Sequence, residues 1–215
     1  MTLNCCSIRN KIHEVMDLAI SEEIDIIFAQ ETWLRNSDTP LLNEIKEYGY
    51  KVITVRKSRE KDFGGGIAVI FKNCINLKRI FYKQPKSFEA LSVQLESADT
   101  KYVFTNIYYP GYSPKHRFSR IAFLNEFSEI LTSSLNDDKK HVILGDFNIH
   151  VENELLCETS LLKEILHTHE FQQIVSCQTH TLGGTLDLAL VNRGILNKIS
   201  DLEVLSDFQH CCRSM

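Results

Sequence analysis

The stretch His141-Val-Ile-Leu-Gly-Asp-Phe-Asn-Ile-His150 limits the folds open to this chain more than any other part of the sequence. Its apolar, partly β-branched start is typical of a buried strand, and Gly145 then precedes a carboxylate and a carboxamide two positions apart. Because alternate side chains of a strand share a face, Asp146 and Asn148 are expected to point the same way. The alternative is a strand that ends in an Asx-type turn, since Asp and Asn are common turn residues.

Length and composition predict one domain over residues 1–215. A chain of 215 residues with 43% hydrophobic residues can bury one sizeable core. The net charge of −4 argues against a broadly basic nucleic-acid binder. Basic residues do gather at 56–61 and at 115–120, where they could face phosphates, although solvated loop charges are the alternative for each cluster.

The cysteines and the longest apolar runs bear on the compartment. Seven cysteines without a C-x-x-C pair suggest neither a disulfide framework nor a zinc site, and reducing conditions suit them best. The runs Ile24–Ala29 and Ile67–Phe71 are too short to cross a bilayer, and the N-terminus lacks the pattern of a secretory signal. We therefore expect an intracellular protein, nuclear or cytoplasmic, with no membrane partner.

Hydrophobic periodicity predicts a β-α-β start with parallel strands, then consecutive antiparallel strands, then further helices and strands. Glycines 64–66 precede a β-branched run, which favours a hairpin turn over a phosphate-binding loop. The expected strands are 3–8, 24–29, 50–56, 67–71, 77–82, 89–96, 102–109, one in the stretch 141–150 that carries Asp146 and Asn148, one through Asp187, and 203–207. The expected helices are 9–23, 40–48, 117–134 and 160–167.

Several polar residues fall at or near the ends of these predicted strands. Each alone has an ordinary structural explanation, but an acid inside an apolar strand, as at Asp187, must be paired or ligating because isolated burial is costly. Together they suit a magnesium-dependent phosphodiesterase, which needs hard oxygen ligands, a carboxylate to activate water and neutral donors for the phosphate. The set is Asn4, Glu31, Tyr108, Asp146, Asn148, Asp187 and Asp207.

The order of these motifs resembles the endonuclease/exonuclease/phosphatase superfamily from end to end. The motifs are Asn4, Gln30-Glu31-Thr32, Asn106-Ile107-Tyr108, Gly145-Asp146-Phe147-Asn148, Thr185-Leu186-Asp187 and Ser206-Asp207. The opening from Leu3 to Lys11, with Thr179-His180 ahead of Asp187, is similar to the apurinic-type endonuclease domain of non-LTR retrotransposons. The resemblance implies an α/β fold: a four-layer sandwich of two packed mixed β-sheets flanked by helices, as in DNase I-like proteins.

The resemblance also implies roles for the metal-site residues. Glu31 would be the principal Mg²⁺ ligand, assisted by Asn4 and Asp207, with Mn²⁺ as an alternative ion. Asp146 would orient or deprotonate the attacking water.

The phosphate and substrate contacts follow in the same way. Asn148 and Tyr108 would hold the scissile phosphate, and Arg117, His180 and Thr181 would contact the substrate.

The chain departs from the family pattern at its last motif. Asp187 would pair with a histidine directly after Ser206-Asp207, but Phe208 occupies that position. His210 is the nearest replacement, although two residues displace it by about 6 to 7 Å along a strand. The chain ends at Met215, where the family continues into a closing strand, so both ends are interpreted as abbreviated.

We therefore expect a Mg²⁺-dependent DNA endonuclease of retrotransposon type, acting as a monomer and impaired by Phe208. A reverse transcriptase encoded downstream is the expected partner besides DNA. Two alternatives remain open: a phosphatase or phosphodiesterase for small substrates, and a catalytically inactive remnant that binds nucleic acid.

Overall fold

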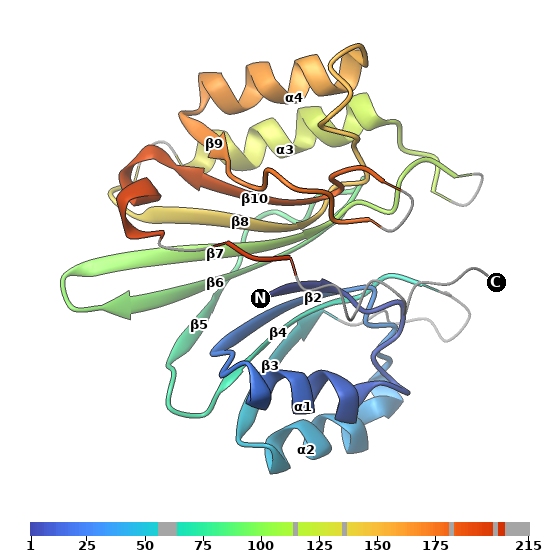
Figure 1. Ribbon diagram of the computed structural model, residues 1–215, viewed down its shortest axis with the longest axis vertical. Coiled ribbons are helices and arrows are strands. Elements are labelled where there is room, and N and C mark those ends of the chain that lie inside the picture. Colours follow the sequence, from blue (N-terminus) through green and yellow to red (C-terminus); the bar gives the residue numbers. More distant parts are fainter. Residues whose placement is uncertain (56–63, 114–115, 135–136, 181–182, 200–201, 205–215) are drawn as a thin grey trace.

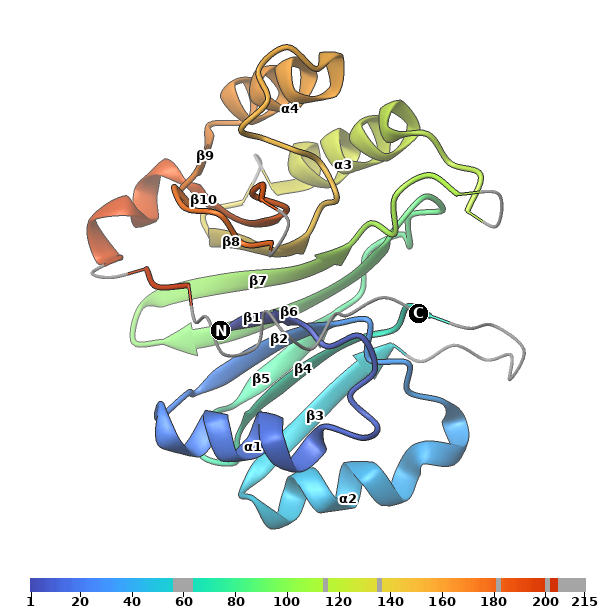
Figure 2. The ribbon, with the colours of Figure 1, turned by 45° about the vertical axis from the view of Figure 1, so that its right-hand side comes forward.

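Two β-sheets pack face to face, and each carries a pair of helices on its outer face (Figures 1 and 2). The computed structural model describes residues 1–55, 64–113, 116–134, 137–180, 183–199 and 202–204. None of the helices in these ranges has the length and apolar character needed to cross a membrane. This architecture confirms the predicted α/β fold of two mixed sheets flanked by helices.

The four-stranded sheet has the order β1-β2-β4-β3. Its strands are β1 (Thr2–Asn4), β2 (Ile26–Gln30), β3 (Tyr50–Val55) and β4 (Ile67–Lys72). Its helices are α1 (Ile12–Ser21) and α2 (Thr39–Glu47), and the 3-10 helix η1 (Asn36–Asp38) directly precedes α2. β1 and β2 are parallel and α1 connects them, as the periodicity predicted. β3 and β4 pair antiparallel on either side of the glycine segment, which confirms the predicted hairpin.

The six-stranded sheet has the order β5-β6-β7-β8-β10-β9. Its strands are β5 (Leu77–Ile80), β6 (Glu89–Ser97), β7 (Thr100–Tyr108), β8 (Lys140–Asp146), β9 (Phe171–Gln173) and β10 (Asp187–Asn192). The helices are α3 (Arg120–Ser134) and α4 (Cys157–Thr168), and the 3-10 helix η2 (Arg193–Lys198) follows β10. α3 and α4 cover one face with a core that includes Phe123, Phe127 and Phe147.

Apolar side chains fill the space between the sheets, and one buried amide pair crosses it. Phe28 and Val69 of the four-stranded sheet pack in one cluster with Leu91 and other residues of the larger sheet. Among them lies Asn106 of β7, fully buried, whose Nδ2 donates to the carbonyl oxygens of Ala29 and Ala68, each 3.0 Å away.

The partner of Asn106 is the equally buried Gln30, whose Nε2 lies 2.5 Å from Asn106 Oδ1. Buried polar groups are favourable only when they are paired, so these hydrogen bonds specify how one sheet is placed against the other.

Strand register brings polar residues together at one end of three adjacent strands in the larger sheet. β7 and β8 are parallel, with Tyr108 opposite Asp146, and antiparallel β10 places Asp187 on the other side of Asp146. Three chemically active side chains therefore occupy neighbouring positions on three adjacent strands.

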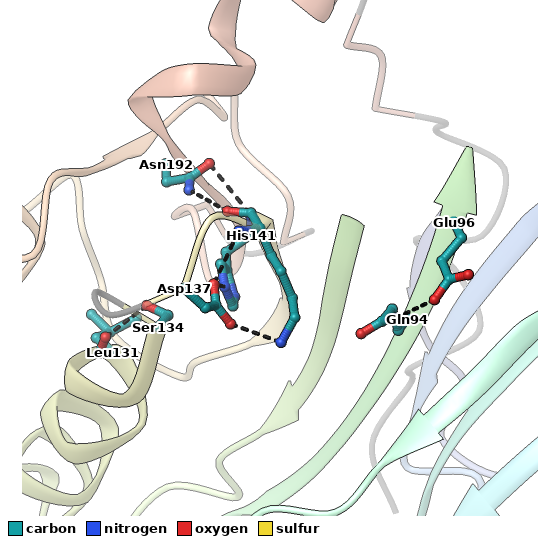
Figure 3. A network of polar contacts seen from close by, with 8 residues as sticks. Gln94, Glu96, Leu131, Ser134, Asp137, His141 and Asn192 are labelled. Atoms are coloured by element: carbon teal, nitrogen blue, oxygen red, sulfur yellow. Dashed lines mark hydrogen bonds and ion pairs between the residues drawn. The ribbon is translucent and has the colours of Figure 1, made fainter. Parts of the chain in front are cut away.

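A polar network anchors the opposite end of β8 (Figure 3). His141 Nε2 lies 2.7 Å from Asp137 Oδ1, and the backbone N–H of His141 donates to Asn192 Oδ1 at 3.3 Å. These contacts tie β8 to β10, so the strand that carries Asp146 is held at both ends.

Two predicted strands differ from the structure, and one observed strand was not predicted. The first strand ends at Asn4 rather than Ile8, because Cys6 and Ser7 adopt positive φ angles of 41° and 79° that no strand accommodates. Residues 203 and 204 are not in a strand, and β9 has no counterpart among the predicted strands.

Candidate active site

Asn4 connects two carboxylates that come from different sheets. Its Nδ2 lies 2.9 Å from Asp146 Oδ2 and 3.2 Å from Glu31 Oε1, and the hydroxyl of Tyr108 donates to the same Glu31 oxygen at 2.8 Å. β1 and the end of β2 supply Asn4 and Glu31, while β7 and β8 supply Tyr108 and Asp146. The four side chains therefore meet where the two sheets face each other.

Strained loops present the first two of these side chains. Glu31 follows the last residue of β2 and has a φ of 48°, and Cys6 donates its backbone N–H to Asn4 Oδ1 at 3.1 Å. Backbone hydrogen bonds join the two loops, since Ser7 N donates to Glu31 O at 2.8 Å. Non-glycine residues in this conformation persist only where the surroundings enforce it, which is common at functional sites.

Asp146 and Asn148 are both near the cleft, but by turn geometry rather than strand alternation. β8 ends at Asp146, and Asn148 has a φ of 47°. Asp146 Oδ1 accepts the backbone N–H of Asn148 at 3.0 Å, which is an Asx-type turn, and Asn148 Nδ2 donates to Tyr109 O at 2.8 Å. The prediction that a continuing strand aligns the two side chains is therefore wrong.

Asp187 is held by a loop residue that our sequence reasoning did not assign. The carboxylate accepts a hydrogen bond from the Thr179 side chain and lies near the charge of His180. Thr179 Oγ1 in turn accepts the backbone N–H groups of Leu186 and Asp187, at 3.0 and 3.1 Å. The pattern of a hydroxyl eight residues before a buried acid is too common to be read from sequence alone.

The electrostatics of the site are dominated by buried negative charge. Burial, followed by the nearby carboxylate of Asp187, raises the pKa of Asp146 to about 8, and the hydrogen bond from Asn4 only partly opposes this. Burial also raises the pKa of Asp187. The pKa of Tyr108 is raised by burial and then by the charge of Glu31, so its hydroxyl stays protonated as a donor.

The acidic and amide side chains of the site line a cleft of 710 Å³; they are Asn4, Glu31, Asp146, Asn148 and Asp187. We call it the acidic cleft, because its described lining includes five carboxylates and neither lysine nor arginine side chains. The carboxylates belong to Glu22, Glu31, Asp146, Asp187 and Glu203.

Oxygen donors and uncompensated negative charge together suit a hard divalent cation. Glu31, Asn4 and Asp146 are the residues that could hold one. Within the described ranges, no three His, Cys, Asp or Glu side chains form a metal cluster by themselves.

The structure places the sequence-predicted residues in three groups. It brings together the residues at strand ends and in the adjoining loops, namely Asn4, Glu31, Tyr108, Asp146, Asn148 and Asp187. His180 also lines the acidic cleft. Arg117 is exposed in the segment before α3 and is not part of the described cleft lining. Thr181, Asp207, Phe208 and His210, with the basic segment 56–61, lie outside the described residues.

Comparison with known proteins identifies the architecture. The model of the Endonuclease/Exonuclease/phosphatase family matches residues 1–207. No curated protein matches the sequence.

Among solved structures, the endonuclease domain of TRAS1, a telomere-specific non-LTR retrotransposon, superposes with a TM-score of 0.72 at 13% identity, over 96% of this chain and 90% of that one. The AP endonuclease LMAP from Leishmania major gives 0.69 at 12% identity, over 93% and 80%. A 3′ phosphatase from Neisseria bound to a product DNA hairpin gives 0.66 at 14%, over 90% and 86%.

Proposed function

The chain belongs to the Endonuclease/Exonuclease/phosphatase family, and from this premise we propose that it is a Mg²⁺-dependent DNA endonuclease of the non-LTR retrotransposon type. The observation that carries the proposal is the contact of Asn4 with both Glu31 and Asp146. A structural role alone would not require two carboxylates, one from each sheet, to share one amide beside an open cleft.

Glu31, with Asn4 and Asp207, would hold the divalent cation, for which Mn²⁺ is an alternative. A cation bound there would supply positive charge against the charge that develops on the phosphate. Asp146 orients the attacking water or accepts its proton. Burial raises the pKa of Asp146, and a cation bound at Glu31 would lower it and so favour the ionised form that a base requires.

Neutral donors complete the proposed site. The Tyr108 hydroxyl and the Asn148 amide donate hydrogen bonds to the scissile phosphate, where they stabilise charge that grows in the transition state. Asp187 accepts a hydrogen bond from Thr179. In the family it would pair with a histidine at position 208, where this chain has Phe208.

DNA is the proposed substrate. Two of the similar structures are named for endonucleases and a third for a phosphatase bound to DNA. Arg117, His180 and Thr181 are the proposed substrate contacts. A reverse transcriptase encoded downstream would use the nick as its primer.

Phe208 favours a second candidate, an inactive remnant that only binds nucleic acid. The family histidine would stabilise the phosphate or the leaving group, and removal of one such donor costs on the order of 100-fold or more in rate. We therefore propose a slow endonuclease, and a histidine at position 208 should raise its rate.

Nicking of supercoiled plasmid tests this proposal. Wild-type protein with Mg²⁺ should convert supercoiled plasmid to open circles, EDTA should stop the reaction, and Glu31→Gln should abolish it. Phe208→His should increase the rate. If wild type is inactive while Phe208→His nicks, the natural chain is the remnant; if neither nicks, the endonuclease assignment fails.

A further inference from the structure

A second hollow, of 520 Å³, begins one residue from the acidic cleft along one loop, from Cys6 to Ser7, and two residues along another, from Glu31 to Trp33. We call it the Trp33 pocket; its lining includes Ser7, Arg9, Trp33, Arg35 and Asp38. The loops that form its walls are the same ones that present Asn4 and Glu31 to the acidic cleft. A ligand that spans both hollows would therefore pass directly over the candidate active site.

Trp33 is held in an unfavourable state that packing alone does not explain. Its φ is 53°, a conformation that bulky side chains rarely adopt, and its backbone N–H donates to Gly65 O at 2.9 Å. Its indole Nε1 is buried and has no hydrogen-bond partner within the described part of the chain. Strain of this kind gathers at ligand sites, where the fold holds a side chain in place for contact.

The charge of the Trp33 pocket is opposite to that of the acidic cleft. Arg9 and Arg35 both line the pocket, and Asp38 is its acid. Asp38 accepts a hydrogen bond from Arg9 Nη2 at 2.9 Å and one from the backbone N–H of Arg35 at 2.8 Å, which fixes the Arg9 side chain and the Arg35 backbone in the pocket wall. The described lining thus sets two guanidinium groups against one carboxylate, a net positive charge.

We propose that the Trp33 pocket is a nucleotide subsite: a base of the bound strand stacks on the Trp33 indole, and its phosphate lies beside Arg9 and Arg35. This inference rests on the proposed function, because it extends the path of a substrate strand from the acidic cleft. Cationic groups beside the five carboxylates of the acidic cleft favour the approach of a polyanion. Aromatic faces and arginines are the groups that bind single-stranded or extruded nucleotides.

The intrinsic fluorescence of the protein reports on this pocket, since Trp33 is the one tryptophan in the sequence. Wild-type protein is titrated in EDTA, which prevents cleavage, with the strand dT12 and with a 12-unit strand of abasic spacers. Stacking predicts that dT12 quenches the emission to saturation, whereas the spacer strand at equal occupancy leaves it nearly unchanged. Occupancy is followed independently by the anisotropy of a labelled strand.

Variants extend the test. From the measured range for one stacked base, Trp33→Ala should weaken dT12 binding about 5- to 150-fold, and Trp33→Phe, which keeps an aromatic face, should weaken it less. Arg9→Gln should weaken the binding of both strands. The control is Lys101→Gln, an exposed residue at the start of β7, about 23 Å from Tyr108 along the strand. It removes the same charge and should leave binding unchanged, and thermal unfolding confirms that each variant is folded.

The outcomes separate the subsite from the enzyme. If wild type nicks plasmid but dT12 binds without quenching, or Trp33→Ala binds as wild type does, the subsite is wrong and the endonuclease stands. If dT12 quenches and no nicking is found, the subsite stands on a protein without the proposed activity. Absence of any strand binding would overturn the subsite as well.

Discussion

Replacement of Gly145 by alanine should disrupt the strand pair that carries the site. Gly145 has a φ of 145°, and a Cβ built there would lie 1.9 Å from Ile107 O, 2.8 Å from Ile107 C and 2.9 Å from Ile107 N. These are backbone atoms of the neighbouring strand β7, so no side chain can rotate away to relieve the overlap. The strands must separate one residue before the Tyr108–Asp146 pair.

The expected cost has two parts that a control variant separates. A left-handed backbone conformation costs an L-residue about 1–2 kcal/mol, and Gly49→Ala isolates that part, because Gly49 has a φ of 84° and nothing within 4 Å of its Cβ position. Overpacking against backbone adds about 1–3 kcal/mol or more. Gly145→Ala should therefore lower the free energy of unfolding by about 2–5 kcal/mol, a large share of the roughly 5–15 kcal/mol typical of proteins.

Urea denaturation followed by circular dichroism measures both variants. With an m value of about 2–3 kcal/mol/M, the midpoint of Gly145→Ala should fall by roughly 1–2 M and that of Gly49→Ala by about 0.5 M. Midpoints that agree within about 0.3 M would show that β7 does not approach β8 as closely as the structure has it.

Three further predictions concern the amide pair and the site. Asn106→Leu removes the hydrogen bonds between the sheets and leaves buried partners unsatisfied, so the free energy of unfolding should fall by about 3–5 kcal/mol. Gln94→Leu is the control, and equal urea midpoints for the two variants would contradict the role of the amide pair. In EDTA, the free energy of unfolding should fall as the pH rises from 5 to 8. The reason is that Asp146 in the folded protein, with a pKa of about 8, still binds a proton that the unfolded carboxyl, with a pKa near 3.9, has released. Asp146→Asn should make the free energy of unfolding less dependent on pH, and an unchanged pH dependence would refute the raised pKa. Tyr108→Phe should slow nicking about 100-fold at nearly unchanged stability, and a wild-type rate would remove the hydroxyl from the mechanism.

Much of the fold could be predicted because the periodicity is local. Ile12, Val15, Met16 and Ala19 mark one face of α1, and all four are buried. The early end of β1 could not be predicted, because Cys6 and Ser7 carry no glycine signal for the positive φ that their loop requires. Contacts with a distant loop impose that conformation.

The site followed from motif order more than from any single residue. Asn4, Glu31 and Asp146 do meet, although 142 positions separate Asn4 from Asp146. Local sequence patterns could not predict the hydrogen bond between Gln30 and Asn106. The two residues are 76 positions apart, and their contact depends on how the two sheets pack.

Binding of Mn²⁺, measured from the electron paramagnetic resonance signal of the free ion, tests the central claim most directly. We expect a bound ion in the wild type and at least about tenfold weaker binding in Glu31→Gln, since one charged ligand is lost. Glu22→Gln removes the same charge from another part of the acidic cleft and should bind as wild type does. Equal affinity in all three proteins would contradict a cation site at Glu31.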